Sequence, residues 1–317
     1  MRLHPGIVAV ALLLGACTAP PPTPSAPGFS FALIGDAPYS PHEETRFVEM
    51  LQALDREALA FIVHVGDFKS GSSRCSDEIF AQRREWFAWS RHPFIYLAGD
   101  NDWTDCWRPS NGAYDPLERL SRLRELFFRG PHSIGVNTLP LTRQSDVAPA
   151  HPYPEHVRWK HGNVLFAGFN LPGGDNNLGR MPQEHAPRDA AARDWLKQAF
   201  ALAHREKVSA VVVLFQANPF TESMQPRRGF TEFLDLLTRE TMAFDGQVLL
   251  VNGDTHHYRV DRPLNHPDTR EPLPNHRRVE VFGSPSVDWV RVRVVDDGER
   301  VRFEISVGNW LLVNGEW

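Results

Sequence analysis

Four apolar segments of this sequence each end in a glycine followed by an aspartate. The dipeptides are Gly35-Asp36, Gly66-Asp67, Gly99-Asp100 and Gly253-Asp254. One such dipeptide is a common turn, because glycine tolerates a tight backbone and aspartate bonds to it locally. Four of them, each after a predicted strand, indicate an α/β sheet whose strand ends bring carboxylates together in one crevice.

Short apolar runs alternate with amphipathic stretches along most of the chain. The pattern predicts strands at 29–35, 60–66, 93–99, 163–170, 208–216 and 246–253, and helices at 43–58, 78–90, 116–128, 187–205 and 227–241. Residues 130–156 are rich in Pro, His and Gly and predict a long irregular insertion.

The end of the chain differs from its body. Strands are predicted at 278–283, 287–295 and 301–307, and Asp296-Asp297-Gly298 is a hairpin signal between the last two. A β-α-β body with an antiparallel end predicts an α/β protein, with a mixed sheet or two packed sheets and helices outside.

The first residues have the layout of a bacterial secretory signal. Met1-Arg2 is followed by an apolar run at 7–14, which is too short to cross a bilayer, and then by small residues and Cys17. The stretch "LGAC" at 14–17 resembles a lipobox. We expect a signal peptide at 1–16, a lipid on Cys17, a Pro-rich tether at 17–28 and one domain at 29–317. The protein would then be exported and anchored to a bacterial membrane, facing the periplasm or the exterior; the alternative is a plain signal peptide.

The two remaining cysteines are Cys75 and Cys106. An exported chain with two cysteines suggests a disulfide between them, and two separate thiols are the alternative. The formal charge of −5 over 317 residues lacks the basic excess of a nucleic-acid-binding protein.

Aspartates that converge in a low-dielectric crevice repel one another and need cations. Divalent metals are the simplest counter-charge, and a bridging carboxylate commonly holds two of them. The sequence therefore predicts a metal site at the strand ends.

The order of these motifs resembles the calcineurin-like metallophosphoesterases, a superfamily that includes the purple acid phosphatases. Its pattern is G-D-x-H, G-D, G-N-H-[DE], a His after a hydrophobic strand, and G-H-x-H. Here Gly35 to Pro38, Gly66-Asp67, Gly99 to Asp102, the stretch "VVVLFQANP" and Gly253 to His256 take these places. The resemblance implies a two-sheet sandwich flanked by helices, with a two-metal site that hydrolyses phosphate esters using a metal-activated water.

The chain departs from that pattern at most of its histidines. Pro38, Gln216 and Asp254 replace three histidine ligands, and Asn101 replaces the His that assists the leaving group. A shift of one residue would instead make Asn101 the ligand in place of Asp100. Carried over by position, the ligands are Asp36, Asp67, Asp100, Asn101, Gln216, Asp254 and His256. We expect two divalent ions (Mn, Fe, Zn or Mg), and this oxygen-rich set favours the harder ones.

Two residues are candidates for handling the proton of the leaving group. Asn101 holds the usual position but cannot donate as an acid, so His257 is the other candidate. Tyr39, near the first motif, is a spare residue for metal ligation, and an ordinary loop tyrosine is the alternative. The substrate would be a small phosphorylated molecule.

The lost histidines favour an alternative, a non-catalytic surface lipoprotein that uses the same fold for binding. A serine hydrolase is not favoured, because the sequence contains no G-x-S-x-G.

Overall fold

The computed structural model describes residues 28–220, 228–298 and 300–308. The expected signal peptide, Cys17 and all of the tether before residue 28 lie outside these residues. Among the described residues, no helix combines the length and apolar character needed to cross a membrane.

Two mixed sheets form the centre of the molecule. The first has the strand order β12-β11-β1-β2-β3, and the second has the order β4-β5-β6-β7-β8-β10-β9. The strands of the first are β1 (Gly28–Ile34), β2 (Ile62–His64), β3 (Phe94–Tyr96), β11 (Val290–Asp296) and β12 (Val301–Val307). Those of the second are β4 (Thr142–Arg143), β5 (Val157–His161), β6 (Val164–Gly168), β7 (Ala210–Leu214), β8 (Gln247–Asn252), β9 (Arg259–Asp261) and β10 (His276–Glu280).

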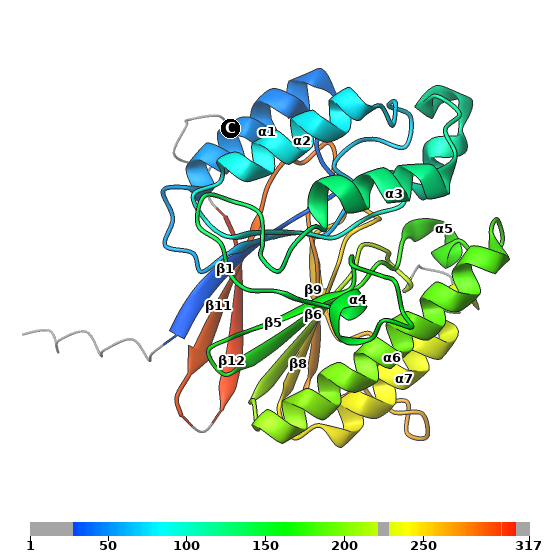
Figure 1. Ribbon diagram of the computed structural model, residues 1–317. Coiled ribbons are helices and arrows are strands. Elements are labelled where there is room, and N and C mark those ends of the chain that lie inside the picture. The colour runs from blue at the N-terminus through cyan, green and yellow to red at the C-terminus, as the bar shows by residue number, and fades with distance from the viewer. Residues whose placement is uncertain (1–27, 221–227, 299, 309–317) are drawn as a thin grey trace, which may run out of the picture.

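The helices lie on the outer faces of the two sheets, as Figure 1 shows. The α-helices are α1 (Pro41–Leu54), α2 (Asp77–Trp89), α3 (Pro116–Phe127), α4 (Gln144–Val147), α5 (Gly173–Asn176), α6 (Pro182–Glu206) and α7 (Thr231–Ala243). Short 3₁₀ turns are η1 (Thr104–Trp107), η2 (Pro109–Asn111) and η3 (Arg228–Phe230).

The side chains of β1 show how the layers are held together. Phe31 and Leu33 pack into the apolar core between the two sheets, whereas Ala32 and Ile34 pack into a second core beneath α1 and α2. This alternation is the two-residue period of a strand that is buried on both faces. A third core lies between the second sheet and helices α6 and α7. The result is the predicted fold class, two packed mixed sheets flanked by helices.

Most of the predicted elements are present, with ends shifted by a few residues. The hairpin at Asp296-Asp297-Gly298 joins β11 and β12 as expected. The insertion predicted at 130–156 contains more structure than expected, namely β4 and α4, and it is followed by β5. Strand β5 pairs with β6 in an antiparallel manner and places Val157 and Trp159 in the core.

Candidate functional site

The loops that follow β1, β2, β3, β7 and β8 meet at one edge of the sandwich. Backbone hydrogen bonds join them across the two sheets. Asp36 N donates to Gly66 O (3.0 Å), Gly253 N donates to Gln216 O (2.8 Å), and Ser284 N donates to Asp36 O (2.8 Å). Residues from five distant parts of the sequence are therefore held side by side.

Four carboxylates gather there and are called the acidic cluster: Asp36, Asp67, Asp100 and Asp254. The backbone N–H of Asp254 donates to both carboxylate oxygens of Asp36, at 3.1 and 3.0 Å. The charges of Asp100 and Asp36 both act on the Asp67 carboxyl group. The side chains of Asp36 and Asp67 are almost completely buried, with exposed fractions of 0% and 2%.

The glycines of the Gly-Asp dipeptides have a packing role that the sequence did not reveal. A Cβ atom on Gly99 would collide with the carboxylate of Asp67, and one on Gly253 would collide with that of Asp36. Each carboxylate thus rests on the glycine of a neighbouring strand end. Glycine is required here because the backbone and a carboxylate approach closely.

The Asp67 carboxylate accepts hydrogen bonds from four donors. Its Oδ1 accepts from the backbone N–H of Asn101 (3.0 Å). Its Oδ2 accepts from Asn101 Nδ2 (2.9 Å), Gln216 Nε2 (3.0 Å) and the Tyr39 hydroxyl (3.3 Å). Asn101 Nδ2 also donates to the Tyr39 oxygen at 2.9 Å. The amides of Asn101 and Gln216 therefore present N–H groups to the acidic cluster.

The orientation of the Gln216 amide follows from its other partner. Its Oε1 accepts a hydrogen bond from Gly173 N at 2.7 Å, so Nε2 faces Asp67. Rotating the amide to point its oxygen at a cation would break this bond. Gln216 is fully buried, so the lost bond would leave a buried N–H without its partner.

Burial and mutual repulsion govern the protonation of the acidic cluster. Burial, followed by the charge of Asp254, raises the pKa of Asp36 well above its usual value. Burial, followed by the charge of Asp100, does the same to the pKa of Asp67. Burial raises the pKa of Asp100 to about 6, with a further contribution from Asp105. This crowding of like charges is the arrangement that cations would relieve.

A buried lysine that the sequence did not single out lies beside these groups. Lys69 is 1% exposed, and its Nζ donates to Ser70 O at 2.9 Å. Burial lowers the pKa of Lys69 to about 8, while the carboxylates of Asp102, Asp67 and others oppose that shift. Its ammonium group supplies part of the positive charge that the acidic cluster requires.

Asp102 has a structural role. Its Oδ2 accepts from Asp67 N (2.9 Å), Gly99 N (2.9 Å) and the Tyr96 hydroxyl (2.7 Å), and its Oδ1 accepts from Phe68 N (3.1 Å). These bonds tie the loop after β2 to the loop after β3. Asp102 thereby fixes the backbone that carries Asp67.

Four of the seven predicted ligands share an unusual backbone conformation. Asp36, Asp67, Asp254 and His256 have φ angles of 48°, 59°, 82° and 62°. Residues other than glycine rarely adopt this left-handed region, although aspartate does so more readily than most. Such conformations often mark functional sites.

The two adjacent histidines are placed differently. His256 Nδ1 is 2.8 Å from Ser284 O, and its ring lies edge-on to Tyr39 with centroids 5.1 Å apart. Donation from Nδ1 to that carbonyl would leave Nε2 as the acceptor, as in histidines that bind metals. His257 is exposed, and its backbone N–H bonds to Glu280.

The predicted disulfide is confirmed. Cys75 and Cys106 are joined, with Cα atoms 5.7 Å apart. The bond links the loop after β2 to η1, just beyond the residues that Asp102 holds together. Both loops that carry Asp67 and Asp100 are thus tied covalently as well as by hydrogen bonds.

The chemical types of the donor groups fit a hard divalent cation, but the arrangement of these groups in the structure does not. The acidic cluster and His256 supply the oxygens and the imidazole that Mg²⁺ or Mn²⁺ accepts. Within the described residues, however, no group of three or more His, Cys, Asp or Glu side chains is arranged to hold a metal ion. The amide N–H groups of Asn101 and Gln216 already donate to the Asp67 carboxylate, at 2.9 and 3.0 Å.

Solved structures of two phosphatases are similar to this one. A dimetal phosphatase from Danio rerio is 12% identical, with a TM-score of 0.53, and the match covers 88% of this chain and 98% of that chain. The purple acid phosphatase PPD1 from yellow lupin seeds is 14% identical, with a TM-score of 0.50, and the match covers 89% and 52%. The protein therefore has the calcineurin-like metallophosphoesterase fold. No protein-family model matches the sequence, and no curated protein matches it significantly.

Proposed function

We propose that this protein is an exported, metal-dependent phosphoesterase that hydrolyses small phosphate esters. The convergence of four carboxylates at the strand ends of this fold, those of Asp36 and Asp67 buried and those of Asp100 and Asp254 half-buried, is the observation that supports the proposal. A divalent cation bound there would neutralise phosphoryl oxygens and lower the pKa of a bound water.

The predicted ligands would surround two cation positions. Asp67 would lie between two cation positions, with Asp36 and His256 on one side. Asp100 or Asn101, Gln216 and Asp254 would lie on the other. Because Gln216 and Asn101 present N–H groups, binding at the second position would require their amides to turn. The first position has no amide among its own ligands besides the shared Asp67, so it is proposed to bind the tighter ion.

Two arginine side chains near the acidic cluster favour an anionic substrate. The charges of Arg108 and Arg180 act on Asp105, which also senses Asp254. The Arg180 guanidinium lies 3.8 Å above the centre of the Trp107 ring, and 42% of Trp107 is exposed. An anion that approaches the carboxylates would pass these side chains. With Asn101 in place of an acid and only His257 as a candidate donor, we propose substrates with stable leaving groups.

The test combines metal analysis with an assay of p-nitrophenyl phosphate. The purified chain is dialysed against Mn²⁺ or Mg²⁺, and bound metal and turnover are measured together. Asp67→Asn should abolish both, because it removes the carboxylate shared by the two positions. Asp235→Asn, on the exposed face of α7, is the matched control and should alter neither. Turnover that survives Asp67→Asn would contradict the proposal.

A non-catalytic binding protein is the second candidate, and one observation favours it. The N–H groups of Asn101 and Gln216 already satisfy the Asp67 carboxylate without a cation. A parent chain that binds no metal and turns over no substrate in the same experiment would support this alternative.

Export and lipid attachment at Cys17 are also part of the proposal. The "LGAC" stretch and the Cys75–Cys106 disulfide support them, since disulfides persist in oxidising compartments. Labelling of expressing cells with radioactive palmitate should mark the parent chain and not Cys17→Ser. Equal labelling of both chains would exclude Cys17 as the lipid site.

A further inference from the structure

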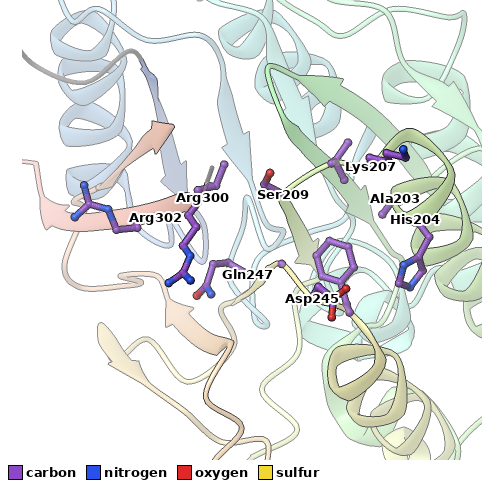
Figure 2. Close-up of a pocket in the computed structure, with 12 residues that line it drawn as sticks. Ala203, His204, Lys207, Ser209, Asp245, Gln247, Arg300 and Arg302 are labelled. Carbon is purple, nitrogen blue, oxygen red and sulfur yellow. The ribbon is translucent and has the colours of Figure 1, made fainter. Parts of the chain in front are cut away.

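A basic pocket lies at the opposite end of the sandwich from the acidic cluster. Its volume is about 620 Å³, within the range of small-molecule sites. Figure 2 shows Arg300 and Arg302 on one side of it, His204 and Lys207 on the other, and Ser209, Gln247 and Asp245 between them. The end of α6, the start of β12 and the loop before β8 contribute these residues.

Among the described residues, no side chain forms an ion pair with the charged groups of the basic pocket. Its walls carry three cations, Lys207, Arg300 and Arg302, against one carboxylate, Asp245. All four residues are exposed. The basic pocket therefore has a net positive charge and donors free to bind an anion.

Apolar residues line part of the same pocket. Phe244 and Val301 are 5% and 1% exposed, and the His204 ring meets that of Phe244 edge-on at 5.4 Å. A ligand with a phosphate and a short apolar stem would match both parts of the lining.

The pairing of the first sheet places this pocket beside the point where the chain enters the domain. Gly28, the first described residue, pairs with Val295, and Val295 pairs with Arg302. Neighbouring strands are about 4.8 Å apart, so Gly28 lies roughly 10 Å from the backbone of Arg302. The acidic cluster begins at the other end of β1, beyond Ile34. The Pro-rich tether would thus reach the domain next to the basic pocket.

We propose that the basic pocket binds the phosphate of an anionic lipid headgroup in the membrane to which the tether leads. This inference rests on the proposed lipid anchor, which would hold the basic end of the molecule against the membrane. The exposed side chains of Lys207, Arg300 and Arg302 contact the headgroup phosphate. The acidic cluster then faces away from the bilayer.

The experiment measures binding of the full chain to lipid vesicles. All proteins carry Cys17→Ser, so that no attached lipid dominates binding. One vesicle type is pure phosphatidylcholine, and the other contains one-third phosphatidylglycerol. Any binding through the apolar segment at 7–14 would be common to both vesicle types, so the ratio of the two affinities isolates the effect of the anionic headgroup. The test variant is Lys207→Asn, Arg300→Gln, Arg302→Gln. The control variant removes three exposed cations elsewhere, by Arg74→Gln, Arg129→Gln, Arg239→Gln.

The parent chain should prefer the anionic vesicles, and the test variant should lose about a hundredfold in that preference, at roughly fivefold per cation. The control variant should keep most of it. Equal losses in both variants would show non-specific charge attraction and overturn the proposal, as would no preference in the parent. In a last experiment, the parent chain and the test variant are titrated with soluble glycerol 3-phosphate, and binding is measured. Loss of its binding in the test variant, without any vesicle preference in the parent, would assign the pocket to a soluble anion instead.

Discussion

Asp102→Asn tests whether one buried carboxylate organises the acidic cluster. Asn has a single acceptor oxygen. If that oxygen takes the place of Oδ2, it keeps the bonds from Asp67 N, Gly99 N and the Tyr96 hydroxyl, and it turns an amide N–H₂ toward Phe68 N. The substitution therefore leaves the buried Phe68 N–H without a partner and weakens three other hydrogen bonds.

The expected cost follows from these four contacts. Replacing a charged acceptor by a neutral one weakens each of the three retained bonds by about 1 kcal/mol, and the unpaired Phe68 N–H adds about 1–3 kcal/mol. Removing a buried charge beside Asp67 offsets roughly 1–2 kcal/mol of this cost, because burial already raises the pKa of Asp102. We expect Asp102→Asn to lower the free energy of unfolding by about 3 kcal/mol.

Urea denaturation of the parent and the variant measures this difference. Tyr96→Phe is the graded comparison, because it removes only one donor to Asp102 and should cost about 0.5–1.5 kcal/mol. Asp235→Asn should be neutral. An Asp102→Asn variant as stable as the parent would refute the argument, since it would mean that relief of charge repulsion outweighs all four hydrogen bonds.

Three other predictions concern protonation, metal preference and the disulfide. Burial lowers the pKa of His64 and of His156 to about 3 in the folded protein, against about 6.5 in the unfolded chain. Each neutral ring therefore contributes its full stability above about pH 6.5, and this contribution is lost as the pH falls from about 6.5 towards 3. Each should cost about 2 kcal/mol at pH 5, and His156→Gln should reduce the loss measured by urea denaturation between pH 7 and pH 5 by that amount. Gln216→His should increase zinc affinity in calorimetric titrations, because it adds an imidazole beside Asp67; an unchanged affinity would show that position 216 does not reach the cation. Replacing Cys75 and Cys106 by serine should lower the free energy of unfolding by about 3–4 kcal/mol, given their separation of 31 residues, and an undiminished urea midpoint would count against a stabilising bridge.

The layers of the fold could be predicted from the sequence because they depend on local periodicity. Strand β1 shows this clearly, since its residues 31–34 form a continuous apolar run that is buried on both faces. Strand β5 was missed because only two of its residues, Val157 and Trp159, are strongly apolar and lie in the core, while its other side chains are charged or half-exposed. Its place in the sheet depends on pairing with β6, which no local pattern specifies.

The candidate site was predictable to a similar extent. The Gly-Asp dipeptides indicated that Asp36, Asp67, Asp100 and Asp254 would meet, and they do lie together. The direction of the Gln216 amide was beyond such reasoning, because it depends on Gly173, which is 43 residues away in sequence. The roles of Lys69 and Asp102 likewise depend on groups that only the folded chain brings near.

The left-handed backbone at Asp36, Asp67 and Asp254 limits which residues can replace them. Alanine would remove the carboxylate and also disfavour the local conformation, by about 1 kcal/mol relative to residues that tolerate it. Asparagine keeps the shape and tolerates the backbone, so it separates chemistry from conformation. If these aspartates are replaced during evolution, we therefore expect asparagine or glycine to appear first. The loops would then keep their backbone conformation after losing their negative charge.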